Sequence, residues 1–173
     1  MRCWQTSRTT VITRMLVHLS RIGGPFLQRL MHFYWRFARG MTLGMRGLVI
    51  NRAGEVFLVK HSYAEGWHLP GGGVELGETL TGALTRELLE EGNITLLAPP
   101  RLHGFYFNAS ASVRDHVALF VVREFEQREA PVPNSEIIEH GFFHPTALPA
   151  DTTPGTRRRI REVIENEPVS ERW

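Results

Sequence analysis

The most constraining feature of this chain is a run of glycines followed by one strongly acidic helix. The glycines at 71–73 permit backbone conformations closed to other residues and a close approach by a ligand. The pattern over 79–92 predicts a helix. Within it, Glu87, Glu90 and Glu91 stand at i, i+3 and i+4, so their carboxylates crowd a sector about 100° wide.

Carboxylates at this spacing repel one another and weaken an isolated helix unless a cation is present. Carboxylate oxygens are the ligands that Mg²⁺ prefers, and Mg²⁺ usually keeps waters and substrate phosphates in its other positions. Arg86 stands four residues before Glu90 and can hold that carboxylate in place. The acidic cluster therefore predicts a phosphate-handling metal site, with a solvated acidic helix face after a glycine turn as the alternative.

The full spacing resembles the Nudix box, the signature of hydrolases that act on nucleoside diphosphates linked to another moiety. Gly72 is followed after five residues by Glu78 and after seven more by Arg-Glu-Leu-Leu-Glu-Glu at 86–91. The family's box ends in glycine and an aliphatic residue, whereas here Asn93 precedes Ile94 and the glycine stands one place earlier. Asparagine is the next most tolerant residue in the left-handed conformation that ends such a helix, so we expect the helix to end there.

The resemblance implies an α/β fold, a Nudix-type α/β/α sandwich with a mixed central sheet, in residues 41–173. An N-terminal extension with an amphipathic helix occupies residues 1–40. Hydrophobic periodicity predicts the individual elements. We expect a β-hairpin of strands 42–50 and 55–61, further strands at 94–97, 102–107, 116–125 and 137–143, and a C-terminal helix over 153–165.

The resemblance also implies an activity and a set of site residues. The activity is Mg²⁺-dependent hydrolysis of the diphosphate linkage in a nucleoside diphosphate derivative such as a nucleotide sugar, ADP-ribose or a modified nucleotide, with Mn²⁺ as a second candidate metal. Glu87 and Glu91 bind metal in the family pattern, with Glu90 a further ligand or base and the Gly71 carbonyl a ligand. Arg86 belongs to the catalytic set, while Gly72 and Glu78 support the site.

A general base must take the proton of the attacking water, and in many family members it lies outside the box. Glu136 and Glu139 are the candidates, with Glu136 preferred and Glu90 the alternative within the box. Six residues can offer stacking surfaces or positive charge to the substrate, with a packing or surface role as the alternative for each. They are Arg46, His61, Trp67, His68, Tyr106 and Arg114.

The charge of the chain is unevenly distributed. Residues 1–54 hold nine arginines and no acidic residue, whereas the rest holds 11 basic and all 18 acidic residues. A basic front end suggests an anionic partner, so an RNA 5′-end pyrophosphohydrolase is one alternative function. A nucleotide-binding module of the same fold without catalysis is another.

The apolar stripe over 26–39 predicts an amphipathic helix. Its aromatic side is expected to cap the domain core, with a membrane-surface or homodimer contact as the alternative.

The composition predicts a cytoplasmic protein. Cys3 is the single cysteine among 173 residues, which excludes an internal disulfide framework and a thiolate zinc cluster. No apolar run reaches the roughly 18 residues of a membrane-spanning helix. The arginine-rich and acid-free first residues also resemble an organelle transit peptide or an extended start.

Overall fold

The computed structural model describes residues 40–173. The helix predicted over 26–39 and most of the basic N-terminal segment lie outside the described residues. In the described part, neither helix is both long and apolar enough to cross a membrane.

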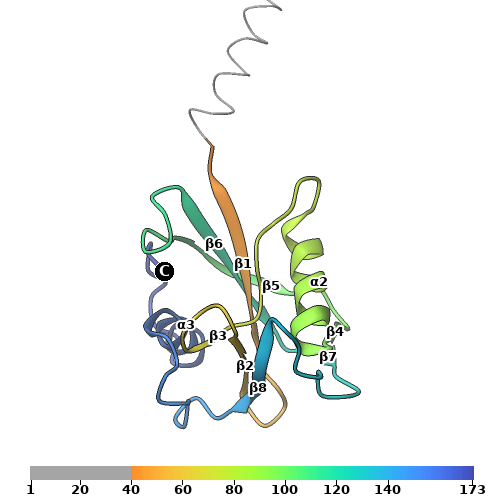
Figure 1. Ribbon diagram of the computed structural model, residues 1–173. Coiled ribbons are helices and arrows are strands. Elements are labelled where there is room, and N and C mark those ends of the chain that lie inside the picture. Colours follow the sequence, from red (N-terminus) through yellow and green to blue (C-terminus); the bar gives the residue numbers. More distant parts are fainter. Residues whose placement is uncertain (1–39) are drawn as a thin grey trace, which may run out of the picture. The chain divides into compact units, whose positions relative to one another are not determined.

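A mixed three-stranded sheet forms the first half of the framework (Figure 1). Strand β1 (Thr42–Val49) pairs in parallel with β6 (Asp115–Val122). On its other edge, β6 pairs in antiparallel fashion with β5 (Arg101–Phe107). This arrangement confirms the mixed sheet that the sequence predicts.

A second sheet is wholly antiparallel, with strand order β3-β2-β8. It contains β3 (Trp67–His68), β2 (Val56–His61) and β8 (Ile137–Phe143). A short antiparallel pair joins β4 (Thr95–Leu96) to β7 (Phe125–Glu126). The predicted strand 116–125 is therefore two elements, because β6 ends at Val122 and the chain turns before β7.

Two helices cover opposite sides of these sheets (Figure 1). Helix α2 (Leu80–Gly92) packs over one core and α3 (Pro154–Ile164) over the other. Side chains alternate between the two faces of a strand, so Met45 and Val49 of β1 lie in the α2 core, whereas Leu48 lies in the α3 core. The strands are apolar on both faces because both faces are covered.

The predicted hairpin of 42–50 and 55–61 is only partly correct. Its turn is present, with the Asn51 amide donating to the Glu55 carbonyl at 3.0 Å, but the two strands share only an isolated bridge between Ile50 and Val56. They diverge because another segment occupies the free edge of β1. The Met45 amide donates to the Gly72 carbonyl at 2.9 Å, and the Gly47 amide to the Pro70 carbonyl at 2.8 Å.

The ends of α2 follow from local residues. Thr79 caps the start by accepting a hydrogen bond from the Gly82 amide at 3.0 Å. Asn93 ends the helix in the left-handed conformation, with φ 50° and ψ 35°, which confirms the expectation at this position. Gly92 serves packing instead, because a Cβ there would lie 3.0 Å from the Phe57 ring and 2.8 Å from Ile94.

Substitution of Asn93 tests this helix end. Asn93→Ala is expected to lower the free energy of unfolding by about 1 kcal/mol, because a left-handed residue other than glycine or asparagine is strained. Asn93→Gly removes that strain but also the Asn93 side-chain bond to the Glu129 carbonyl, so its stability should stay closer to that of the wild type. Urea denaturation of both variants measures the difference, and equal stabilities would contradict the assignment.

Candidate active site and metal centre

The glycine run holds the acidic helix against the edge of β1. Gly71 has a φ of +134°, and a Cβ on it would lie 2.3 Å from the Met45 carbonyl oxygen. Its amide donates to Glu91 Oε2 at 2.7 Å, and its carbonyl accepts a hydrogen bond from the Arg46 guanidinium. The next residue, Gly72, leaves room for Glu87, since a Cβ there would lie 2.4 Å from Glu87 Oε1. Both predicted metal-binding glutamates thus meet the glycine backbone.

Glu91 is the buried member of the acidic cluster, with 5% of its surface exposed. Burial raises the pKa of its carboxyl to about 8. His61 Nε2 lies 3.6 Å from Glu91 Oε1, and burial together with the nearby Arg46 charge lowers the pKa of His61 to about 4. At neutral pH and without a bound cation, the two groups are a neutral imidazole beside a protonated carboxyl and do not form an ion pair.

Glu136 reaches the same place from the loop before β8. One ligand atom from each of His61, Glu91 and Glu136 lies within 4.8 Å of the others. The Tyr63 hydroxyl donates to Glu136 Oε1 at 3.2 Å, and the Ser62 amide donates to the Glu136 carbonyl at 2.8 Å. The register of β2 against β8 shifts between Lys60 and His61. Irregularities of this kind redirect side chains at functional sites.

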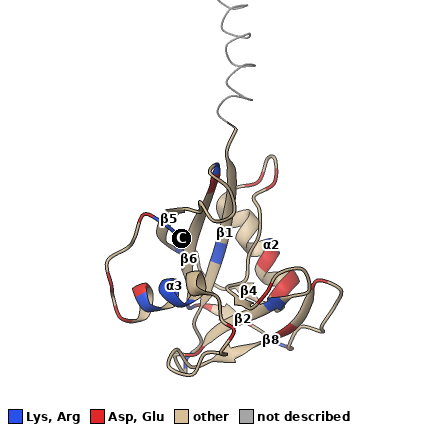
Figure 2. Cartoon of the chain, turned by 60° about the vertical axis from the view of Figure 1, so that its left-hand side comes forward, with Lys and Arg blue, Asp and Glu red and all other residues tan. Residues whose placement is uncertain are grey.

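Arg86 organises the exposed part of the acidic cluster. Its guanidinium donates to both carboxylate oxygens of Glu78, at 2.9 and 3.1 Å, and to Glu87 Oε1 at 2.8 Å. These bonds lower the pKa of Glu78. Glu90 lies 3.3 Å from the same guanidinium, with 60% of its side chain exposed. Figure 2 shows acidic residues gathered on α2.

The donor set fits a divalent cation. Neither ring nitrogen of the buried His61 has a hydrogen-bond partner among residues 40–173. A buried polar atom without a partner is costly, and a neutral imidazole nitrogen is a common metal ligand. Carboxylate oxygens beside it are ligands for Mg²⁺ and Mn²⁺. The carboxylates and the imidazole therefore both suit a divalent cation. Carboxylates favour Mg²⁺ and Mn²⁺, whereas an imidazole nitrogen favours transition metals.

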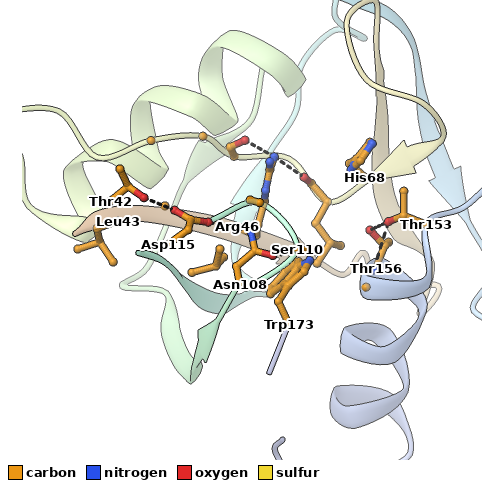
Figure 3. A pocket seen from close by; sticks show the side chains of 18 of the residues that line it. Thr42, Leu43, Arg46, His68, Asn108, Ser110, Asp115, Thr153, Thr156 and Trp173 are labelled. Atoms are coloured by element: carbon orange, nitrogen blue, oxygen red, sulfur yellow. Dashed lines mark hydrogen bonds between the residues drawn. The ribbon is translucent and has the colours of Figure 1, made fainter. Parts of the chain in front are cut away.

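A cavity of about 730 Å³ opens beside the glycine run. Arg46, Tyr63 and His68 line it, and Figure 3 shows Arg46 and His68 in its wall. Its remaining walls come from β1, from the loop between β5 and β6, from the start of β6, from the start of α3 and from the segment after α3. The polar and aromatic residues among them include Thr42, Asn108, Ser110, Asp115, Thr153, Thr156 and Trp173.

Two of the predicted substrate residues line this cavity, Arg46 and His68. The other predicted residues Trp67, Tyr106 and Arg114 are not among the residues that line it. Trp67 packs edge-on against Phe143 at 4.9 Å, and Tyr106 is fully buried. Both belong to the core under α3, where their faces of the strands are covered.

Arg114 lies in the exposed turn before β6, and its carbonyl accepts a hydrogen bond from the Thr42 amide at 3.0 Å. The cavity is lined by the next residue, Asp115. The remaining predicted substrate residue, His61, lies with the acidic groups.

Glu139 is held in a different place from Glu136. Its carboxylate lies 3.4 Å from the Lys60 ammonium, which also contacts Asp151 at 3.1 Å.

Tyr63 is a site residue that the sequence analysis missed. Its only sequence signal is its place two residues after His61, because a loop has no periodicity to reveal which side chain faces a cavity.

Comparisons with known proteins agree with this geometry. The NUDIX domain family matches residues 41–163. A protein of Bacillus subtilis (strain 168), provisionally named an 8-oxo-dGTP diphosphatase, is 26% identical over 121 residues, which cover 70% of this chain and 78% of that protein.

Solved structures share the fold. A MutT NUDIX hydrolase from Burkholderia pseudomallei superimposes with a TM-score of 0.62 and 26% identity, covering 70% of this chain and 97% of that one. An ADP-ribose pyrophosphatase from Streptococcus suis 89-1591 has a TM-score of 0.57 and 20% identity, covering 76% and 97%. The acidic helix, the glycine run and the sheets that hold them, together with these matches, place this chain in the Nudix hydrolase family.

Proposed function

We propose that this protein hydrolyses the diphosphate linkage of a nucleoside diphosphate derivative in a reaction that depends on Mg²⁺ or Mn²⁺. The observation that carries the proposal is the contact between the acidic cluster and the cavity through one residue. Gly71 binds Glu91 through its amide and Arg46 through its carbonyl, and both Gly71 and Arg46 line the cavity. A cavity of about 730 Å³ has the size of a small-molecule site.

Glu87 and Glu91 would hold the cation, with Glu90 and the Gly71 carbonyl as further ligands. His61 and Glu136 have donor atoms close enough to Glu91 to join them. When bound, a divalent cation neutralises charge on phosphate oxygens and lowers the pKa of a coordinated water. Arg86 holds Glu87 and Glu78 in place through its hydrogen bonds.

The remaining steps belong to side chains at the cavity. Arg46 lies where its guanidinium can bind a phosphate oxygen, a ligand that suits its planar set of donors. Glu136 is the group we assign as the general base, because it is exposed to solvent and lies beside Glu91. The Tyr63 hydroxyl that donates to Glu136 fixes the orientation of that carboxylate.

A substitution pair separates the two candidates for the base. Glu136→Gln is expected to lower kcat by about 10²-fold, the smaller end of what general base catalysis supplies. Glu139→Gln should leave kcat within a factor of about two, since Glu139 is a surface partner of Lys60. Steady-state kinetics on both variants decides between them, and a larger loss in Glu139→Gln would overturn the assignment.

The proposed function is tested by product release from a substrate panel with Mg²⁺, with Mn²⁺ and with a chelator. The panel holds ADP-ribose, nucleotide sugars, 8-oxo-dGTP and unmodified nucleoside triphosphates. We expect turnover of one class that stops when the metal is removed. Turnover that persists in the chelator, or nucleotide binding with no turnover of any class, would contradict the proposal.

A further inference from the structure

The segment that follows α3 is built into the domain, although the family match ends at residue 163. Residues 171–173 pair with Phe107, the last residue of β5. The Phe107 amide donates to the Glu171 carbonyl at 2.9 Å, and the Trp173 amide donates to the Phe107 carbonyl at 3.1 Å. Phe107 and Arg172 form a parallel bridge. Backbone pairing of this kind sets the register of a segment and thus the direction of its side chains.

Two buried charged residues of α3 fasten this segment. Arg159 has no exposed surface, and its guanidinium lies 2.8 Å from Glu162 Oε1. It also donates to the Arg172 carbonyl at 3.1 Å and to the Ser170 hydroxyl at 3.1 Å, while the Ser170 amide donates to Glu162 at 3.2 Å. A buried ion pair is costly unless hydrogen bonds satisfy it. The segment supplies three such bonds, so the buried pair helps to set its position.

These hydrogen bonds place the Trp173 indole in the wall of the cavity (Figure 3). The Arg158 guanidinium holds the Trp173 carbonyl at 2.6 Å. The ring meets Tyr106 edge-on with centroids 5.6 Å apart and lies against Gly155, where a Cβ would be 2.6 Å from the indole nitrogen. The indole is partly exposed and lines the cavity beside Asn108 and Ser110.

The cavity therefore has two chemically different parts. The rings of Tyr63 and His68 lie beside the His61 ring, with ring centroids 4.9 and 5.6 Å from that of His61, which places them beside the metal-binding groups. Trp173 is the aromatic ring on the part formed by α3 and the loop between β5 and β6. Asp115, at the start of β6, also lines the cavity and accepts hydrogen bonds from Thr42 at 2.6 Å and from Asn108 at 2.7 Å. A flat apolar ring beside oriented polar groups is suited to a nucleobase.

We infer that Trp173 is a specificity-determining residue whose indole contacts the nucleobase of the substrate. The inference rests on the proposed function for the location of the diphosphate at the acidic cluster. The nucleoside then extends from the glycine run toward α3. Asn108 and Asp115 line the same cavity as the indole, and their polar groups are the ones we assign to the edge of the base.

The test compares Trp173→Ala, Trp173→Leu and Trp173→Phe in the full chain. Calorimetry measures the affinity for AMP, GMP, CMP and UMP, and separately for inorganic pyrophosphate, each with Mg²⁺. Loss of the ring should weaken binding of the preferred nucleoside monophosphate by about 10-fold or more, the range of base stacking on an aromatic side chain. Pyrophosphate affinity should stay unchanged, and Trp173→Phe should recover most of the nucleotide affinity.

Trp173→Leu keeps an apolar side chain against Gly155 and Tyr106, so it reports on the ring if the alanine variant fails to fold. Unchanged nucleotide affinity in the leucine variant would overturn the inference. An equal loss of nucleotide and pyrophosphate affinity would also overturn it, because that result indicates a structural role for Trp173. In kinetics on the substrate identified above, KM should rise in the variants more than kcat falls. Absence of hydrolysis in the wild type would refute the proposed function. Nucleotide binding does not require turnover, so the calorimetric comparison would still decide whether Trp173 contacts the base.

Discussion

Replacement of Glu91 by Gln is expected to lower kcat by about 10³-fold while leaving the fold intact. The loss follows because a bound cation supplies several kcal/mol of transition-state stabilisation, and about 1.4 kcal/mol corresponds to a tenfold change in rate. Glutamine has nearly the same shape, and its amide oxygen can still accept the hydrogen bond from the Gly71 amide. Glu91 is buried and its pKa is raised to about 8, so in the absence of metal at neutral pH the neutral amide replaces a carboxyl that is already protonated.

Three measurements separate the metal role of Glu91 from a structural one. Mn²⁺ affinity, followed by electron paramagnetic resonance, should fall in Glu91→Gln together with kcat. Thermal denaturation without metal should give a Tm equal to or above that of the wild type. Glu124→Gln makes the same chemical change at an exposed residue outside the site and should change neither quantity. Normal Mn²⁺ affinity in Glu91→Gln would refute the assignment of this carboxylate as a ligand.

Replacement of Gly71 by Ala is expected to lower the free energy of unfolding by about 3 kcal/mol. The added Cβ would lie 2.3 Å from the Met45 carbonyl oxygen, and the φ of +134° is one that side-chain-bearing residues rarely adopt. Strained backbone costs about 1–3 kcal/mol, and forcing extra volume into a packed place costs about 1–3 kcal/mol more. The atoms nearest to the added Cβ are backbone atoms of Met45 and Arg46 and not the ends of flexible side chains, so the backbone itself must move.

Gly73→Ala is the matched control for this prediction. A Cβ on Gly73 meets no atom within 4 Å, so its stability should stay within about 0.5 kcal/mol of the wild type. Urea denaturation gives both values. The backbone movement caused by Gly71→Ala should also weaken Mn²⁺ binding, because the Gly71 amide orients Glu91. Equal stability of the two alanine variants would show that the glycine run tolerates side chains at both positions.

Much of the candidate site could be predicted because its determinants are local. The spacing of Glu87, Glu90 and Glu91 follows from helix geometry alone. The end of α2 at Asn93 follows from the conformational preferences of a single residue, and the structure confirms it. Local preferences also located the turn at 51–54, since asparagine and glycine select the backbone conformation there.

Other features depended on contacts between distant parts of the chain. The sequence could not show that residues 70–74 would pair with β1 and so separate β1 from β2. Apolar alternation marks two faces of a strand without saying which elements cover each face. For this reason Trp67 and Tyr106 resembled cavity residues, although α3 covers both of them.

The sequence by itself determined the acidic helix, its glycine approach and the family. The tertiary structure decided which groups join that helix at one place. Glu91 of α2 meets His61 of β2 and Glu136 from the loop before β8 because strand pairing brings those two strands together. The segment after α3 reaches the cavity because the buried charges of Arg159 and Glu162 require its hydrogen bonds. Charged groups need hydrogen bonds from other parts of the chain only once they are buried, since in an unfolded chain water supplies those bonds.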